Sequence, residues 1–155
     1  MLIEKFIARR LTATHATISL AESCTGGRLS DRLTNIPGSS AFFIGGVIAY
    51  SNMLKIQLLG VSPALIKHHG AVSAEVASQM SRGIRKLLKT SYGIAITGIA
   101  GPSGGSASKP VGLAYIAISS PQETVCRKYR FTGTRSRIKN QAATRALYLL
   151  KDILP

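Results

Sequence analysis

The stretch from Thr97 to Gly112 constrains the fold most, because its sequence, TGIAGPSGGSASKPVG, is too rich in glycine, serine and proline to pack as a helix or a strand. The apolar runs on either side, YGIAI over residues 92–96 and VGLAYIAIS over residues 111–119, are each typical of a short buried strand. A long loop is therefore predicted between two strands. Its glycines let backbone N–H groups approach an anion, especially a phosphate. A mobile connection without a ligand is the alternative interpretation.

A second polar turn follows another apolar run. The run TISLA over residues 17–21 is typical of a buried strand, and the turn ESCTGG leads from it directly into a helical pattern. This order places Ser23, Thr25 and the backbone around Gly26 at the carboxyl end of a strand, where open α/β sheets bind ligands. Helix capping alone also explains a serine and a threonine at these positions, so both interpretations remain open.

Helical patterns and short apolar runs alternate along the chain. We expect helices near residues 2–11, 28–35, 52–58, 63–69, 73–88 and 136–153, and strands near residues 17–21, 46–50, 92–96, 111–119 and 123–131. This alternation predicts an α/β fold, a three-layer α/β/α sandwich on a mixed sheet of about five strands. The length of 155 residues suits one domain covering residues 1–155.

The composition is strongly basic. Twenty Lys and Arg against 6 Asp and Glu give a net charge of +14, which favours an anionic partner. The cations are scattered, aromatic residues are few and no nucleic-acid motif is present, so a nucleic-acid partner is not favoured. The longest apolar run, residues 41–50, is too short to cross a bilayer, and the first residues do not form a signal-peptide core. With only two cysteines, these features predict a cytoplasmic protein without a membrane partner.

Three polar side chains between residues 40 and 55 predict serine chemistry. A serine hydroxyl becomes nucleophilic when a base takes its proton, and a lysine with a lowered pKa is such a base. Ser40 and Lys55 fit this pattern, and the hydroxyl of Tyr50 is placed to pass a proton or to orient the pair. Ordinary surface side chains are the alternative interpretation.

Metal and cofactor chemistry is not indicated. His68 and His69 are adjacent and have no carboxylate cluster near them, so we expect no metal site. The glycines of the loop follow neither the dinucleotide nor the P-loop fingerprint, and we expect no cofactor.

Six blocks carry a family resemblance that spans nearly the whole chain in order. They are AESCTGG, GSSAFFIGGVIAYSNMLK, LLGV, GAVSAEVA, TGIAGPSGGSASKPVG and FTGTR. Together they resemble the C-terminal domain of the CinA family, the nicotinamide-nucleotide amidohydrolase of the PncC type, in its stand-alone form.

The resemblance implies an α/β/α fold and a reaction in pyridine-nucleotide salvage, the hydrolysis of nicotinamide mononucleotide to nicotinic acid mononucleotide and ammonia. It also implies homo-oligomers, of which a dimer is favoured. A non-catalytic binding module for nucleic acid or competence partners is the alternative function, and the net charge of +14 motivates it.

The resemblance also implies a role for individual residues. Ser40 would be the nucleophile or catalytic hydroxyl, Lys55 its base and Tyr50 a supporting acid. The expected substrate-binding residues are Ser23, Thr25, Gly26, Thr97, Gly98, Gly101, Gly105 and Arg135, of which Arg135 would hold the phosphate or close the site. The chain departs from the family pattern at Met53, where relatives usually have glutamate, and at Lys139, where they usually have arginine. Lysine keeps the positive charge of arginine but not its bidentate geometry.

Overall fold

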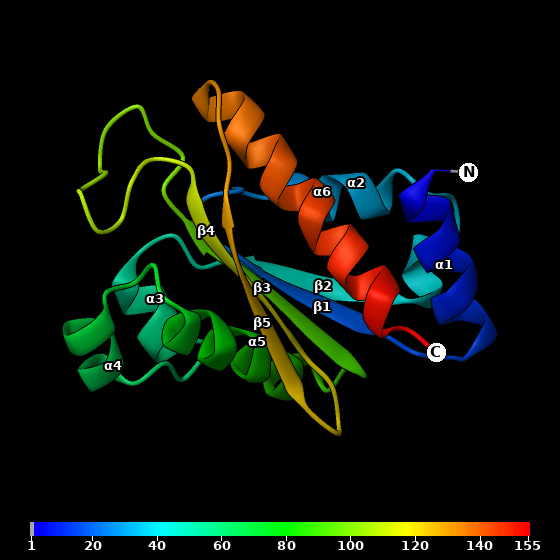
Figure 1. The fold of residues 1–155 in the computed structure, drawn as a ribbon. Helices are drawn as coiled ribbons and strands as arrows, with labels where there is room; N and C mark the ends of the chain where they lie inside the picture. The colour runs from blue at the N-terminus through cyan, green and yellow to red at the C-terminus, as the bar shows by residue number, and fades with distance from the viewer. Residues whose placement is uncertain (1) are drawn as a thin grey trace.

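A computed structural model describes residues 2–155 and shows a five-stranded sheet between two layers of helices (Figure 1). The elements in chain order are α1 (Ile3–Ala13), β1 (Ile18–Glu22), α2 (Arg28–Thr34), the short 3₁₀ helix η1 (Ser39–Ala41), β2 (Phe43–Ile48), α3 (Asn52–Gln57), α4 (Pro63–His69), α5 (Ala74–Leu88), β3 (Tyr92–Gly98), β4 (Leu113–Ser119), β5 (Thr124–Arg130) and α6 (Arg135–Ile153).

The strands lie in the order β2-β1-β3-β4-β5, and the sheet is mixed, as predicted. β1 is parallel to both of its neighbours, so that Leu20 lies between Gly46 of β2 and Ile94 of β3. β3, β4 and β5 pair antiparallel. The carboxyl ends of β1, β2 and β3 therefore meet at one edge of the sheet, where the chain leaves each strand through a polar turn or loop. β2 begins earlier than the sequence indicated and ends at Ile48, which leaves Tyr50 beyond the strand.

Helices cover both faces of the sheet, which confirms the predicted three-layer arrangement (Figure 1). α1, α2 and α6 pack on one face, where Leu29 and Leu147 are fully buried. α5 covers much of the other face and buries Met80 and Ile84 there. The two cores are separate apolar clusters, and the sheet between them holds the strand ends in fixed positions.

Gly83 allows α5 to pack unusually close to the chain that follows α3. A Cβ at this position would lie 1.9 Å from the carbonyl oxygen of Leu59, well inside van der Waals contact. The close approach therefore depends on the missing side chain, although glycine in a helix interior costs about 1 kcal/mol relative to alanine.

The two edges of the sheet differ in charge. β5 carries Arg127, Lys128 and Arg130, and charged residues on an edge strand discourage the addition of a further strand. β2 has the sequence FIGGVI, with no charged residue, and exposes about half of the side chains of Ile44 and Ile48.

The two ends of the described chain lie on the side of the molecule away from the glycine-rich loop (Figure 1). Within residues 2–155, no helix has the length and apolar character that a membrane span requires.

Candidate active site

A cavity of about 340 Å³ lies at the carboxyl ends of β1 and β3, beneath the glycine-rich loop. Its size falls within the range of small-molecule sites. It is lined by Ser23, Cys24, Tyr50, Asn52, Lys55, Ala71, Val72, Thr97, Gly98, Ile99, Ala100, Gly101, Ser103, Gly104 and Arg135. The chemical character of the cavity is set by one buried amine, one buried hydroxyl next to it and a guanidinium at the loop.

The buried amine belongs to Lys55, whose side chain is only 2% exposed. Its Nζ donates hydrogen bonds to Ser23 Oγ at 3.2 Å, to the carbonyl of Ala49 at 2.8 Å and to the carbonyl of Tyr50 at 3.3 Å. Burial lowers the pKa of Lys55 from its usual 10.5, and the neighbouring Cys24 thiol opposes this shift in part. The lysine is therefore easier to deprotonate than a lysine in water.

The three contacts of Lys55 hold the neutral amine in the orientation of a base. When the ammonium loses the proton that points to Ser23, the two remaining protons still donate to the carbonyls of Ala49 and Tyr50. The lone pair then faces the Ser23 hydroxyl at 3.2 Å, within the reach of proton transfer. Ser23 and Lys55 thus form a pair in which the lysine can activate the serine as a nucleophile.

Ser40 does not take part in this pair, and the expected contact between Ser40 and Lys55 is corrected here. Ser40 lies in η1, before β2, and is exposed, whereas Lys55 follows β2 and contacts the carbonyl of Ala49 beyond its other end. The six residues of β2 span about 20 Å. Ser23 occupies the position beside the lysine that the sequence interpretation had given to Ser40.

The turn after β1 is held by Glu22. Its buried carboxylate accepts hydrogen bonds from the backbone N–H groups of Leu29 and Ser30, both at 3.0 Å, and from Ser30 Oγ at 2.7 Å. The carboxylate therefore caps the first turn of α2. Its negative charge interacts favourably with the positive end of the helix dipole. It fixes the turn that carries Ser23 and is not itself a base for the cavity.

Thr25 and Gly26 belong to this turn but do not line the cavity. Thr25 is completely buried, and its Oγ1 has no hydrogen-bond partner among residues 2–155. Gly26 adopts a positive φ of 59°, and a Cβ there would meet Lys139 Nζ at 3.4 Å. Gly26 thus permits the tight turn and brings Lys139 of α6 next to it.

Cys24 was not expected in the site, although it lines the cavity beside Ser23. Burial raises the pKa of its thiol to about 11, so the thiol is neutral at physiological pH and is a poor nucleophile. Its backbone N–H has no acceptor in another residue of the described chain. This N–H directly follows the serine, which is the position of an oxyanion donor in many serine hydrolases.

Arg135, at the first turn of α6, joins two walls of the cavity. Its Nη1 donates to the carbonyl of Gly101 in the loop at 2.7 Å, and its Nη2 donates to the hydroxyl of Tyr50 at 3.1 Å. Tyr50 is 61% exposed and so stands at the mouth of the cavity, not beside the Ser23 hydroxyl. The arrangement places a permanent positive charge at the entrance, next to the backbone of the loop.

The remaining predicted residues have mainly structural contacts. Thr97 lines the cavity but donates its hydroxyl to the carbonyl of Ala71 at 2.9 Å, which ties β3 to the segment before α5. Gly98 also lines the cavity, and a Cβ there would clash with the carbonyl of Leu113 at 2.8 Å. Gly105 does not line the cavity. Some glycines of the loop therefore allow close packing, and others leave the backbone accessible from the cavity.

The structure brings together seven of the predicted residues in one cavity, namely Ser23, Tyr50, Lys55, Thr97, Gly98, Gly101 and Arg135. It does not bring Ser40, Thr25, Gly26 or Gly105 to its lining. The contact between Ser23 and Lys55 follows from the strand order. Ser23 and Lys55 both follow parallel strands that are neighbours in the sheet, and such strands present their carboxyl ends at the same edge.

Comparison with known proteins relates the whole chain to one family. A family model described as the CinA C-terminal domain matches residues 2–154. The chain is 50% identical over 149 residues to a CinA-like protein of Acidobacterium capsulatum, a match that covers 96% of this chain and 36% of that protein. It is 51% identical over 148 residues to a putative competence-damage inducible protein of Moorella thermoacetica, with the same two coverages. The chain thus spans about a third of the length of these curated relatives.

Solved structures share the fold. A CinA superfamily protein from Klebsiella pneumoniae superposes with a TM-score of 0.95 at 34% identity, covering 98% of this chain and 95% of that one. The competence/damage inducible protein CihA from Agrobacterium tumefaciens superposes with a TM-score of 0.91 at 35% identity, covering 98% and 96%. The mixed five-stranded sheet with its two helical layers is therefore the fold of these proteins as well.

Proposed function

The chain belongs to the CinA C-terminal domain family, and from that premise we propose that it is an amidohydrolase that converts nicotinamide mononucleotide to nicotinic acid mononucleotide and ammonia. The observation that carries the proposal is the contact of 3.2 Å between Lys55 Nζ and Ser23 Oγ, two buried groups at the base of a cavity. A lysine that is buried without a carboxylate is costly to the fold, and such groups are typical of functional sites.

The reaction follows from this pair. Neutral Lys55 takes the proton of Ser23, and the serine oxygen attacks the carboxamide carbon. The negative oxygen of the tetrahedral intermediate lies on the side of the Cys24 N–H, which stabilises it. Lys55 returns the proton to the amide nitrogen, the C–N bond breaks and ammonia leaves. Water then cleaves the acyl-serine, again with Lys55 as base, and releases the carboxylic acid.

The other walls of the cavity suit a phosphate-bearing substrate. Arg135 supplies a permanent charge at the mouth, and the loop offers the backbone of Gly101 and Gly104 nearby. The N–H groups of these two glycines have no acceptor among the described residues. Guanidinium groups and free backbone amides are the usual donors to phosphate. The phosphate would therefore lie at the loop and the carboxamide at the Ser23–Lys55 pair.

The alternative, a non-catalytic binding module, explains less of the cavity. Binding alone requires neither a buried amine nor a hydroxyl aligned with it. The basic charge, which motivated that alternative, is also compatible with an enzyme whose substrate carries a phosphate.

The proposal is tested by incubating the purified protein with nicotinamide mononucleotide and measuring ammonia together with nicotinic acid mononucleotide. Both products are expected in equal amounts. Nicotinamide riboside is the matched control, because it has the same carboxamide but no phosphate and should be turned over much more slowly. A folded protein that releases neither product would contradict the proposal.

The pH dependence follows from the lowered pKa of Lys55. Only the neutral amine accepts the serine proton, so kcat/KM is expected to rise with pH as Lys55 loses its proton. Because burial lowers this pKa, the plateau should be reached below the pH at which a lysine in water deprotonates, near 10.5. Initial rates with subsaturating substrate across the pH range give the profile. Activity that falls as the pH rises through this range would contradict a lysine base.

A further inference from the structure

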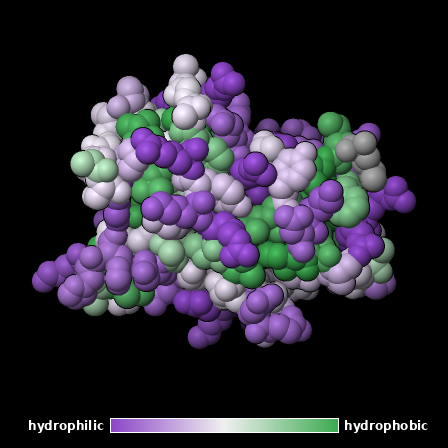
Figure 2. Space-filling model, in the orientation of Figure 1, coloured by the Kyte–Doolittle hydropathy of each residue, from purple (hydrophilic) through white to green (hydrophobic). Residues whose placement is uncertain are grey.

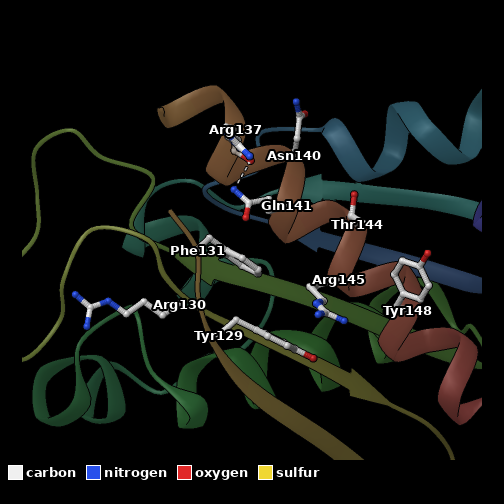
Figure 3. A pocket seen from close by; sticks show the side chains of 9 residues that line it. All are labelled: Tyr129, Arg130, Phe131, Arg137, Asn140, Gln141, Thr144, Arg145 and Tyr148. Carbon is white, nitrogen blue, oxygen red and sulfur yellow. Dashed lines mark hydrogen bonds between the residues drawn. The ribbon is translucent and has the colours of Figure 1, made fainter. Parts of the chain in front are cut away.

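A groove of about 710 Å³ lies between β5 and α6, apart from the candidate active site (Figure 3). This groove and the cavity of the candidate active site share no lining residue. We call it the β5–α6 groove. Its aromatic and charged lining residues are Tyr129, Arg130, Phe131, Arg137, Arg145 and Tyr148. Figure 2 shows an apolar area bordered by hydrophilic side chains near the middle of this face, over the region between α6 and β5.

The charge of the groove is entirely positive. Arg130 comes from β5, Arg137 and Arg145 come from α6, and no carboxylate lines the groove. All three arginines are exposed, and none of them forms an ion pair with a carboxylate within residues 2–155. Unpaired arginines gathered in a groove favour an anionic ligand, and phosphates most of all.

The groove also presents aromatic rings. Tyr129 and Phe131 stack with their ring centroids 5.6 Å apart and their planes 11° from parallel. The guanidinium of Arg145 lies over the Tyr129 ring, 6.0 Å from its centroid. Tyr148, one turn further along α6, is 44% exposed (Figure 3). Phe131 is buried and Tyr129 half-buried, so these two rings support Arg145, and the exposed ring of Tyr148 and the guanidinium plane of Arg145 are the surfaces on which unpaired bases can stack.

The charged and aromatic side chains along α6 are spaced to contact an extended ligand. Arg137 and Arg145 are eight residues apart, which corresponds to about 12 Å along the helix axis. Tyr148 follows on the same face, so a ligand along the groove meets both charges and rings. A duplex keeps its bases paired and stacked inside, out of reach of these rings, whereas a single strand exposes them. An acidic peptide would use the arginines but not the rings.

We propose that the β5–α6 groove binds a short single-stranded segment of nucleic acid, with phosphates on the arginines and bases on the Tyr148 ring and the guanidinium plane of Arg145. Scattered cations, few aromatic residues and the lack of a nucleic-acid motif do not favour such a partner from the sequence, but the fold gathers three aromatic residues and three arginines here.

Binding should depend little on base sequence. The amide of Gln141 already donates to the carbonyl of Thr132 at 2.8 Å. The amide oxygen of Asn140 accepts a hydrogen bond from Arg28 at 2.7 Å. With one end of each amide engaged within the protein, neither side chain can form a bidentate contact with a base, so stacking and phosphate contacts are the main interactions, and neither reads sequence.

The test is fluorescence anisotropy with a labelled oligothymidylate of about 15 nucleotides, within the site sizes of single-strand binding proteins. The triple variant R130Q/R137Q/R145Q should bind at least about tenfold more weakly, and its log–log salt slope should fall by about 2, since each lost phosphate contact removes about 0.7. The matched control is R82Q/K86Q/K89Q, which removes the same charge from exposed positions on α5 and its C-cap and should bind nearly as the wild type does.

A second variant separates stacking from charge. Tyr148→Ala should weaken binding about tenfold without changing the salt slope, because it removes a ring and no charge. Hydrolysis of nicotinamide mononucleotide should be unchanged in all of these variants, which keeps this inference independent of the proposed activity. The proposal would be overturned if the two triple variants lost affinity equally, or if a duplex bound as tightly as the single strand. It would also be overturned if polyglutamate displaced the labelled oligothymidylate as well as a single strand does.

Discussion

Replacing Ser23 with alanine is expected to lower kcat/KM for nicotinamide mononucleotide by about a thousandfold or more, the usual scale for loss of a nucleophile. The hydroxyl that Lys55 contacts at 3.2 Å would be gone, and no other hydroxyl among the described residues contacts the Lys55 amine. Steady-state rates measured beside a thermal unfolding curve give the result. The melting temperature should change little, because the substitution removes one oxygen and keeps the turn.

Ser40→Ala is the matched control for this experiment. Ser40 is an exposed serine at the other end of β2, so its loss should leave the rate close to that of the wild type. The reverse outcome, an active Ser23→Ala enzyme and an inactive Ser40→Ala enzyme, would restore the pairing first expected from the sequence.

Gly83→Ala is expected to lower the free energy of unfolding by about 3 kcal/mol or more. Alanine normally stabilises a helix interior relative to glycine by about 1 kcal/mol. Helix propensity alone would therefore predict a more stable variant, whereas we expect a less stable one. The new Cβ would lie 1.9 Å from the carbonyl oxygen of Leu59. To relieve the overlap, α5 must move away from the backbone of Leu59. For a chain of this size the melting temperature should fall by roughly 10 °C.

Gly60→Ala provides the comparison for a glycine without a close neighbour. A Cβ at Gly60 meets nothing within 4 Å, but its φ of 68° disfavours alanine. The expected loss is about 1 kcal/mol, from backbone strain alone. Chemical denaturation of both variants measures the difference. A Gly83→Ala protein as stable as the wild type would show that α5 does not depend on this close approach.

The architecture could be predicted because its signals are local. The buried strands are short apolar runs, and the pattern of α5, with Val76, Met80 and Ile84 on one face, identifies its core side without tertiary information. The exposed edge strand β2 was placed three residues late because its central glycines and alternating burial weaken the apolar signal at its start. The extent of the domain and the predicted assembly into homo-oligomers stay predictions.

The proposed catalytic pair, Ser23 and Lys55, could not be read from the sequence in the same way. Ser40 and Lys55 are close along the chain, but the whole of β2 lies between them. Ser23 is 32 residues from Lys55, and β1 and β2 bring the two together as parallel neighbours. Strand order, which sequence patterns do not give, decides which hydroxyl meets the lysine.

The β5–α6 groove also could not be predicted from the sequence, because its charged and aromatic residues meet only in the fold. Its arginines and rings come from two segments that are each unremarkable in sequence, an edge strand with alternating burial and a long amphipathic helix. They form one surface only when α6 lies beside β5 (Figure 3). A count of aromatic residues along the chain cannot reveal that three of them meet there.

The position of the two chain ends has a practical consequence for fusion proteins. Both lie on the side away from the glycine-rich loop (Figure 1), so an affinity tag, a fluorescent reporter or a surface linker joined at either end leaves the mouth of the cavity unobstructed. α1 and α6, which carry these ends, pack against each other. A circular permutation would join the two ends by a linker that spans the side of the molecule on which they lie, with new ends opened in an exposed connection such as the β4–β5 turn.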